Sequence, residues 1–510
     1  MTVSNTQYAI ELKGITKRFG TVVANDKIDL QVKQGEILAL LGENGSGKTT
    51  LMNMLSGIYK PDEGSIYVRS VPVSINSPED AKKLGIGMIH QHFKLVDVLS
   101  AADNIYLGSK DKKLFLSKNR FKDIKDIADK FGLNIKPKKM VYDMSVSEKQ
   151  TVEIVKVLYQ GADILILDEP TAVLTPQETQ RLFEILRKMR ENGCAVIIIT
   201  HKLNEVMAIS DRVTILRKGK SIETVNTSET TTQQLTELMV GRPIELSIDR
   251  PVCDTKEPVL TVHHLSIKNE DEIDAIKDVS FDLFGGEILG VAGVAGSGQK
   301  ELCEALVGLQ KIHTGAILYK KENIEKKTTR QIIEMGISMS FIPEDRLGMG
   351  LAASLSITDN LLLKSYRKSS TPLVDRKSAA KLASKIIDEL DIATPSPLLP
   401  VRRLSGGNVQ KVLLGREIEA SPNVLITAYP VRGLDINSSY VIYNALNEQK
   451  QKGVAILYIG EDLDVMMELC DRIMVLCHGS ITGIVEATKT TKEQLGLMMA
   501  GITDTEGADG

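Results

Sequence analysis

Short apolar runs alternate with longer amphipathic stretches along most of this chain. Residues 37–41, 164–167 and 195–199 are wholly apolar, which is typical of strands buried on both faces of a sheet. Between the last two runs, residues 179–192 place apolar side chains at helical spacing. Strands that alternate with helices in this way predict an α/β fold with largely parallel sheets.

The pattern occurs twice. Gly35-Glu-Ile-Leu38 returns as Gly286-Glu-Ile-Leu289, an offset of 251 residues, and Asp211-Arg-Val213 returns as Asp471-Arg-Ile473, an offset of 260. Repeats this far apart indicate two homologous domains, since solenoid repeats are only ~20–50 residues long. We predict a first domain over residues 1–242, a linker over 243–257, a second domain over 258–502 and a tail over 503–510.

Composition narrows the function classes. The 510 residues carry a net charge of −3, so no overall basic field favours binding to nucleic acid. The first residues lack the basic and apolar segments of a secretory signal, and no apolar run approaches the ~18–20 residues of a membrane span. Five scattered cysteines without a C-x-x-C pair predict reduced thiols rather than disulfide bridges or a zinc site.

Residues 42–50 fit the phosphate-loop pattern G-x-x-x-x-G-K-[ST] between a predicted strand and a predicted helix. Glycines let backbone N–H groups converge on phosphate oxygens, and the helix N-terminus adds a favourable dipole. Lys48 would reach the β- and γ-phosphates, and the Thr49 hydroxyl would bind Mg²⁺. The predicted nucleotide-binding residues of this loop are Gly42, Glu43, Asn44, Gly45, Ser46, Gly47, Lys48, Thr49 and Thr50.

Four polar residues follow other apolar strands. Asp168 and Glu169 end the run at 164–167, where Asp168 would hold Mg²⁺ and Glu169 would act as general base on the attacking water. His201, after the run at 195–199, would contact the γ-phosphate, and Gln91 would contact Mg²⁺ and the water. Alone, each could be an ordinary polar strand end, but the phosphate loop in the same domain favours catalytic roles.

Phe19 lies ahead of the phosphate loop in Lys17-Arg-Phe-Gly20. An aromatic ring at this place could stack on a nucleobase, or it could belong to the core of the domain.

The order of these motifs resembles the nucleotide-binding domain of an ABC ATPase, over nearly the whole chain and in both copies. In that family two domains pack head to tail, and each ATP lies between the phosphate loop of one and the signature, Leu-Ser-Gly-Gly-Gln, of the other. The resemblance therefore implies two P-loop NTPase domains with helical subdomains, fused into an intramolecular head-to-tail pseudo-dimer that binds ATP and Mg²⁺.

The second copy departs from the family at every catalytic position. Gln299 stands where the phosphate-loop lysine belongs, and Lys300 stands at the threonine position. Ala428 and Tyr429 replace the carboxylate pair, and Glu461 replaces the histidine. Loss of the base and the metal carboxylate together predicts a site that does not hydrolyse ATP.

The signature motifs show the opposite pattern, because here the second copy matches the family sequence and the first copy does not. The second copy keeps Leu404-Ser405-Gly406-Gly407, and it also keeps Asp435 in a Gly-Leu-Asp loop, whereas the first copy has only Ser145-Val-Ser147. Head-to-tail pairing would bring Ser405, Gly406, Gly407 and Asp435 to the nucleotide held by the first phosphate loop. We therefore predict one hydrolytic and one non-hydrolytic site.

Fused pairs with a defective second half and the Pro-Glu-Asp-Arg sequence at 343–346 look like the energising subunits of importers of simple sugars and nucleosides. Residues 85–97 are more similar to the nucleoside branch, so nucleosides are the favoured solute and ribose- or galactose-type sugars the alternative. The resemblance implies transmembrane permease subunits and an extracytoplasmic solute-binding protein as partners, with the chain peripheral to the membrane at its cytoplasmic face.

Two other classes stay open. One is a soluble fused ABC ATPase acting on ribosomes or DNA, and the other is a regulatory protein that binds ATP without turnover. The short predicted linker and the mild negative charge disfavour the first, and the intact Asp168, Glu169 and His201 disfavour the second.

Overall fold

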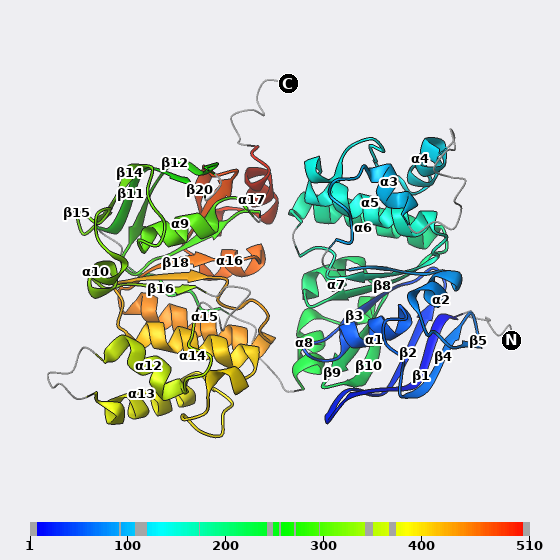
Figure 1. The fold of residues 1–510 in the computed structure, drawn as a ribbon, viewed down its shortest axis with the longest axis horizontal. Helices are drawn as coiled ribbons and strands as arrows, with labels where there is room; N and C mark the ends of the chain where they lie inside the picture. The colour runs from blue at the N-terminus through cyan, green and yellow to red at the C-terminus, as the bar shows by residue number, and fades with distance from the viewer. Residues whose placement is uncertain are drawn as a thin grey trace. The chain divides into compact units, whose positions relative to one another are not determined.

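The computed structural model describes residues 8–90, 93–107, 120–172, 174–241, 248–253, 257–269, 272–294, 296–341, 350–366 and 374–502. The chain divides into two compact units, Met1–Glu245 and Leu246–Gly510 (Figure 1). The predicted bounds of the linker and the tail stay a prediction, because residues 242–247, 254–256 and 503–510 lie outside the described residues.

A six-stranded sheet organises the first unit, in the order β10-β9-β3-β8-β7-β6. The neighbours from β9 to β6 are parallel, and only β10 is antiparallel to β9. All residues of the apolar runs that form β3, β7 and β8 are buried, as their sequences predict. The strands are β3 (Ile37–Leu41), β6 (Ile86–Ile89), β7 (Ile164–Asp168), β8 (Ala195–Thr200), β9 (Arg212–Arg217) and β10 (Lys220–Asn226).

Alternate residues of these strands enter two different cores. Leu38 and Leu40 pack with Leu51 of α1 on one face, whereas Ile37 packs with Leu182 and Leu186 of α6 on the other. Figure 1 shows α1 on one side of the sheet and α3, α5 and α6 on the other. The helices are α1 (Lys48–Leu55), α2 (Pro78–Lys83), α3 (Ala101–Tyr106), α4 (Arg120–Phe131), α5 (Val146–Tyr159), α6 (Pro176–Glu191), α7 (Leu203–Ile209) and α8 (Thr232–Val240).

An antiparallel sheet, in the order β2-β1-β4-β5, accompanies the parallel one. It comprises β1 (Tyr8–Phe19), β2 (Val22–Lys33), β4 (Glu63–Val68) and β5 (Val71–Val73). Its strands alternate buried and exposed residues, because one face packs on the core and the other faces solvent. This sheet was not predicted from the sequence; it joins segments on both sides of the phosphate loop.

The second unit repeats both sheets, in the orders β16-β17-β18-β13-β19-β20 and β12-β11-β14-β15. Its strands are β11 (Pro258–Lys268), β12 (Asp274–Phe284), β13 (Ile288–Ala292), β14 (Thr314–Tyr319), β15 (Glu322–Asn323), β16 (Ile337–Phe341), β17 (Val424–Ala428), β18 (Ala455–Ile459), β19 (Arg472–Cys477) and β20 (Ser480–Glu486). Its helices are α9 (Gln299–Leu306), α10 (Thr329–Glu334), α12 (Ile357–Ser365), α13 (Arg376–Glu389), α14 (Gly406–Glu419), α15 (Ile436–Gln451), α16 (Leu463–Leu469) and α17 (Lys492–Met499). None of the helices in the described part of the chain has the length and apolar character needed to span a membrane.

Candidate active site

The phosphate loop of the first unit connects β3 to α1, as predicted. A Cβ atom at Gly42 would lie 2.3 Å from the carbonyl oxygen of Leu216. At Gly47, where φ is 98°, a Cβ would lie 2.5 Å from the carbonyl oxygen of Ala24. Only glycine fits either place, so the backbone curls tightly into the N-terminus of α1 and leaves its N–H groups available to an anion.

Two polar side chains inside this loop match a phosphate ligand. The buried Oγ of Ser46 has no hydrogen-bond partner among the described residues. The buried ammonium of Lys48 donates to the carbonyl oxygens of Gly42 and Glu43, at 2.6 and 2.9 Å. Burial lowers the pKa of Lys48, although the charges of Asp168 and Glu169 oppose that shift. An anion held in the loop would satisfy the hydroxyl and the ammonium together.

Asp168 ends β7 beside the first turn of α1, and its carboxylate accepts a hydrogen bond from the side chain of Thr49. Desolvation, and then the neighbouring charge of Glu169, raise the pKa of Asp168 to about 6. A carboxylate and a hydroxyl are oxygen ligands of the kind that Mg²⁺ binds alongside nucleotide phosphates. The residues therefore fit the predicted metal, whose positive charge would favour the ionised carboxylate.

Glu169 and His201, which the sequence placed on separate strands, come together. The backbone N–H of Glu169, at φ 47°, donates to the carbonyl oxygen of Ile199 on β8. His201 follows that strand, and its Nδ1 lies 2.9 Å from Oε1 of Glu169. The hydrogen bond to His201 lowers the pKa of Glu169, in spite of opposing desolvation. A carboxylate that stays ionised and is oriented by a histidine suits a general base.

Gln91 lies outside the described residues, as does the 343–346 sequence of the second unit. Strand β6, which ends just before Gln91 in the sequence, is the parallel neighbour of β7. The predicted contact of Gln91 with Mg²⁺ stays a prediction.

Phe19 ends β1 with 44% of its surface exposed, so it is not a core residue. Its ring packs edge-on against Tyr59, with centroids 5.2 Å apart, and Lys17 Nζ lies 5.6 Å from its centre. This exposure argues against the core alternative for Phe19, and stacking on a nucleobase stays a prediction.

The signature and loop residues all begin helices. Ser405 caps α14 and accepts from the backbone and side-chain nitrogens of Asn408, at 3.4 and 2.9 Å. Asp435 caps α15 and accepts from the backbone N–H of Ser438, at 2.8 Å. In the first unit, Ser145 caps α5 in a capping box with Glu148. These contacts account for the residues structurally, and the roles of Ser405, Gly406, Gly407 and Asp435 toward a nucleotide stay predictions.

The second unit reproduces the backbone of the active site but not its chemistry. Tyr429 has φ 52°, and its N–H donates to Ile459 O at 2.8 Å, matching the geometry of Glu169. Its ring packs on the core, and burial raises the pKa of Tyr429 to about 12. Glu461, at the histidine position, forms an ion pair with Arg432. The position of Asp168 is taken by the buried Ala428.

Comparison with known proteins decides the family. The ABC transporter profile matches residues 25–172 and residues 276–430, once in each unit. This chain belongs to the ABC transporter family. Its two units are ATP-binding cassettes, which confirms the predicted α/β fold with two P-loop NTPase domains; the head-to-tail pairing of the domains stays a prediction. The chain is an ABC ATPase, and its nucleotide is ATP.

Several relatives align with this ABC protein over nearly their whole length. It is 45% identical to the guanosine import ATP-binding protein NupO of Bacillus subtilis, over 98% of this chain and 99% of the relative. It is 42% identical to the nucleoside import ATP-binding protein NupA of Lactococcus lactis, over 96% and 98%. It is 38% identical to a ribose import ATP-binding protein, RbsA 1, of Rubrobacter xylanophilus, over 96% and 98%.

The first cassette also contains a polar network that was not predicted from the sequence. Glu205 of α7 accepts from Thr171 Oγ1, at 2.6 Å, and from Thr200 Oγ1, at 3.3 Å. Its carboxylate also lies 3.2 Å from the ammonium of Lys202. Thr171 follows Glu169 by two residues and Thr200 precedes His201, so Glu205 connects the two segments that carry Glu169 and His201.

A signal for this network was present in the repeat. At the offset of 260 residues, Thr171, Thr200 and Glu205 correspond to Val431, Gly460 and Val465. Three polar residues of the first ABC cassette are thus apolar or glycine in the second. Comparing the copies position by position, rather than motif by motif, would have found them.

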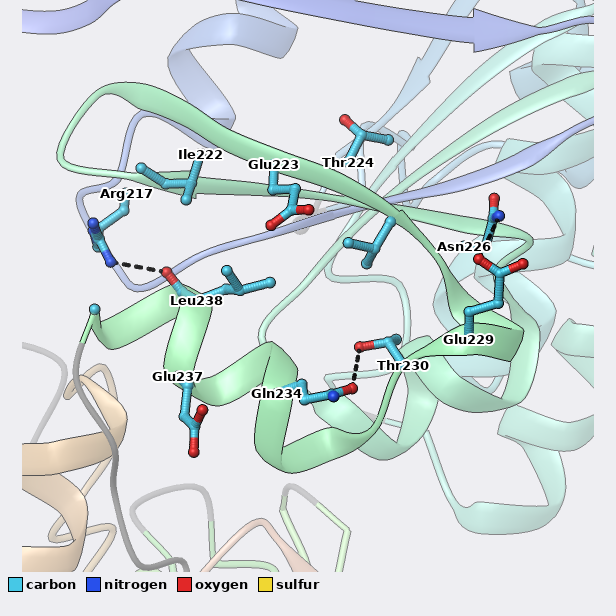
Figure 2. A pocket seen from close by; sticks show the side chains of 12 residues that line it. Arg217, Ile222, Glu223, Thr224, Asn226, Glu229, Thr230, Gln234, Glu237 and Leu238 are labelled. Atoms are coloured by element: carbon cyan, nitrogen blue, oxygen red, sulfur yellow. Dashed lines mark hydrogen bonds between the residues drawn. The ribbon is translucent and has the colours of Figure 1, made fainter.

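The cavity in Figure 2 belongs to another part of the first cassette, between β10 and α8, and has a volume of about 820 Å³. Polar groups that line it pair with one another: Arg217 donates to the backbone carbonyl oxygen of Leu238, and the Asn226 side chain donates to that of Glu229. None of the predicted nucleotide-binding residues lines it. It is therefore distinct from the active site of this ABC protein.

Proposed function

We propose that this chain is the ATP-hydrolysing subunit of a nucleoside importer, with one hydrolytic site and one non-hydrolytic site. The pair formed by Glu169 and His201 carries the catalytic part of the proposal, because the second cassette has Tyr429 and Glu461 in their places. The solute is supported by the two nucleoside-import relatives, which are at least 42% identical to this chain.

In this proposal, each site residue of the first cassette has a defined task in hydrolysis. Lys48 and the loop N–H groups hold the phosphates. Thr49 and Asp168 would hold Mg²⁺, which would supply positive charge to the phosphates. Glu169 accepts a proton from the attacking water, while His201 orients the Glu169 carboxylate through Nδ1. Gln91 and Phe19 keep their predicted roles toward the metal and the base.

The second cassette contributes its signature in this proposal. Ser405, Gly406, Gly407 and Asp435 complete the site of the nucleotide held by the first phosphate loop, as head-to-tail pairing in this family requires. The division of departures supports this role: the second cassette has lost its catalytic side chains and kept its signature, whereas the first has done the reverse.

The partners follow from the importer role. The chain would bind transmembrane permease subunits at the cytoplasmic face of the membrane, and through them work with an extracytoplasmic solute-binding protein. Relatives that align over the same full length are named as ATP-binding proteins of importers, which supports a separate energising subunit.

Uptake of labelled solutes tests the proposal. Cells that lack this chain would be complemented with wild type or with Glu169→Gln, and guanosine, uridine, ribose and galactose would be supplied separately. We expect wild type alone to restore nucleoside uptake. Restoration of ribose or galactose uptake instead would establish the sugar-importer alternative, which the ribose-import relative supports. Unchanged uptake of all four would reject import of these solutes and favour the soluble ABC ATPase.

A further inference from the structure

We propose that the second phosphate loop binds the polyphosphate end of a nucleotide without a metal ion, and that Lys300 takes the place of the metal. The inference extends the non-hydrolytic site of the proposed function, and it rests on the contrast between a retained backbone and an altered set of side chains.

At two of its glycines, the backbone of the second loop matches that of the first. Gly296 and Gly298 have φ angles of 85° and 101°, and the corresponding Gly45 and Gly47 have φ angles of 80° and 98°. A Cβ at Gly298 would lie 2.6 Å from the carbonyl oxygen of Ala275, so this position also accepts only glycine. The second loop therefore keeps the shape that directs N–H groups at an anion.

The hydrogen bonds of the loop match as well. Ser297 N donates to Val294 O at 3.1 Å, the distance at which Ser46 N donates to Glu43 O in the first loop. The Oγ of Ser297 is buried and has no partner among the described residues, as at Ser46. A buried hydroxyl without a partner is costly, so its presence in both loops points to a ligand that accepts a hydrogen bond from it.

The metal-binding side chains, in contrast, are replaced. Thr49, which donates to Asp168 in the first cassette, corresponds to Lys300, and Asp168 corresponds to Ala428. The buried methyl group of Ala428 offers no ligand to Mg²⁺. The side chain of Lys300 is 61% exposed, and the one ion pair that it makes among the described residues is a long one, 3.8 Å, with Glu304. Its ammonium can therefore turn to a phosphate and supply positive charge where the first cassette would use a metal.

Gln299 does not restore the missing lysine. Its side chain is buried, and its Nε2 lies 3.4 Å from Val294 O, so it fills the space of Lys48 with a neutral amide. With Tyr429 in place of the base, a bound nucleoside triphosphate would stay intact. The site would hold ATP or ADP as a structural ligand.

Equilibrium binding of a fluorescent ATP analogue to the full chain tests the proposal. The first site is disabled with Lys48→Ala, and binding is measured with Mg²⁺ and again with EDTA. We expect one nucleotide per chain to bind in both solutions, with affinity about tenfold or more weaker when Lys300→Ala is added. Binding that disappears in EDTA, or that is unchanged by Lys300→Ala, would overturn the proposal.

Lys300 is exposed, so Lys300→Ala should fold as wild type does. A matched Lys300→Arg variant retains the charge and should retain binding. Gly298→Ala in the Lys48→Ala background closes the loop and should abolish the remaining binding. Because the readout is bound nucleotide in a chain with a disabled first site, it is independent of the import assay. Failure of either result leaves the other standing.

Discussion

Replacement of Glu169 by glutamine should remove nearly all ATP hydrolysis, whereas Tyr429→Phe should leave it unchanged. The two positions form a matched pair, because each follows the same strand end with a φ near 50° and donates its N–H to the neighbouring strand. Glutamine has the size of glutamate and can keep a contact with His201. The substitution therefore removes the proton acceptor with little change in shape.

The size of the effect follows from the state of the carboxylate. The hydrogen bond from His201 holds the pKa of Glu169 below its ordinary value, so the group is ionised at neutral pH and its whole contribution is lost in the variant. A positioned general base contributes about 10²–10⁴-fold, which is about 2.7–5.4 kcal/mol of transition-state stabilisation. The raised pKa of Tyr429 keeps its hydroxyl protonated at neutral pH. The hydroxyl that Tyr429→Phe removes therefore cannot act as a general base.

The assay is phosphate release by the purified chain at saturating ATP and Mg²⁺, with binding of a fluorescent ATP analogue measured in parallel. Glu169→Gln should bind nucleotide as wild type does and turn it over at about 1% of the wild-type rate or less. If this variant keeps most of its activity, or if Tyr429→Phe loses as much, hydrolysis does not depend on the Glu169 carboxylate and the asymmetry argument is wrong.

Three further predictions concern the first cassette. His201→Gln removes the imidazole hydrogen bond that lowers the pKa of Glu169, so the pKa should rise. Because activity is lost as pH falls through this pKa, the acid limb of the pH–rate profile should move to higher pH. Glu205→Gln weakens the contacts to Thr171 and Thr200, and in steady-state assays it should lower kcat several-fold with little change in KM. As a control, Glu223→Gln, at an exposed position on β10, should change neither kcat nor KM. Leu40→Ala, in the fully buried β3, should lower the free energy of unfolding by about 2–5 kcal/mol in urea titrations.

Local pattern predicted the parallel sheets and the phosphate loop because their signals lie within a few residues of each other. An apolar run buried on both faces looks the same wherever its neighbours are, so β3, β7 and β8 could be identified without knowing their order. The antiparallel sheet escaped prediction because β1 pairs with β4, more than forty residues away, across the phosphate loop and α1. Pairing at that distance depends on tertiary packing rather than on local preference.

The same division holds for the active site. The sequence by itself determined the asymmetry of the cassettes and predicted which residues carry the chemistry, because Lys48, Glu169 and their replacements are matters of residue identity at aligned positions. Only the tertiary structure decided that His201 Nδ1 meets Glu169 and that Glu205 ties their two segments together. The pairing of β7 with β8 brings these groups within hydrogen-bond distance. A hydrogen bond depends on the distance and direction between donor and acceptor, and residue identity alone specifies neither.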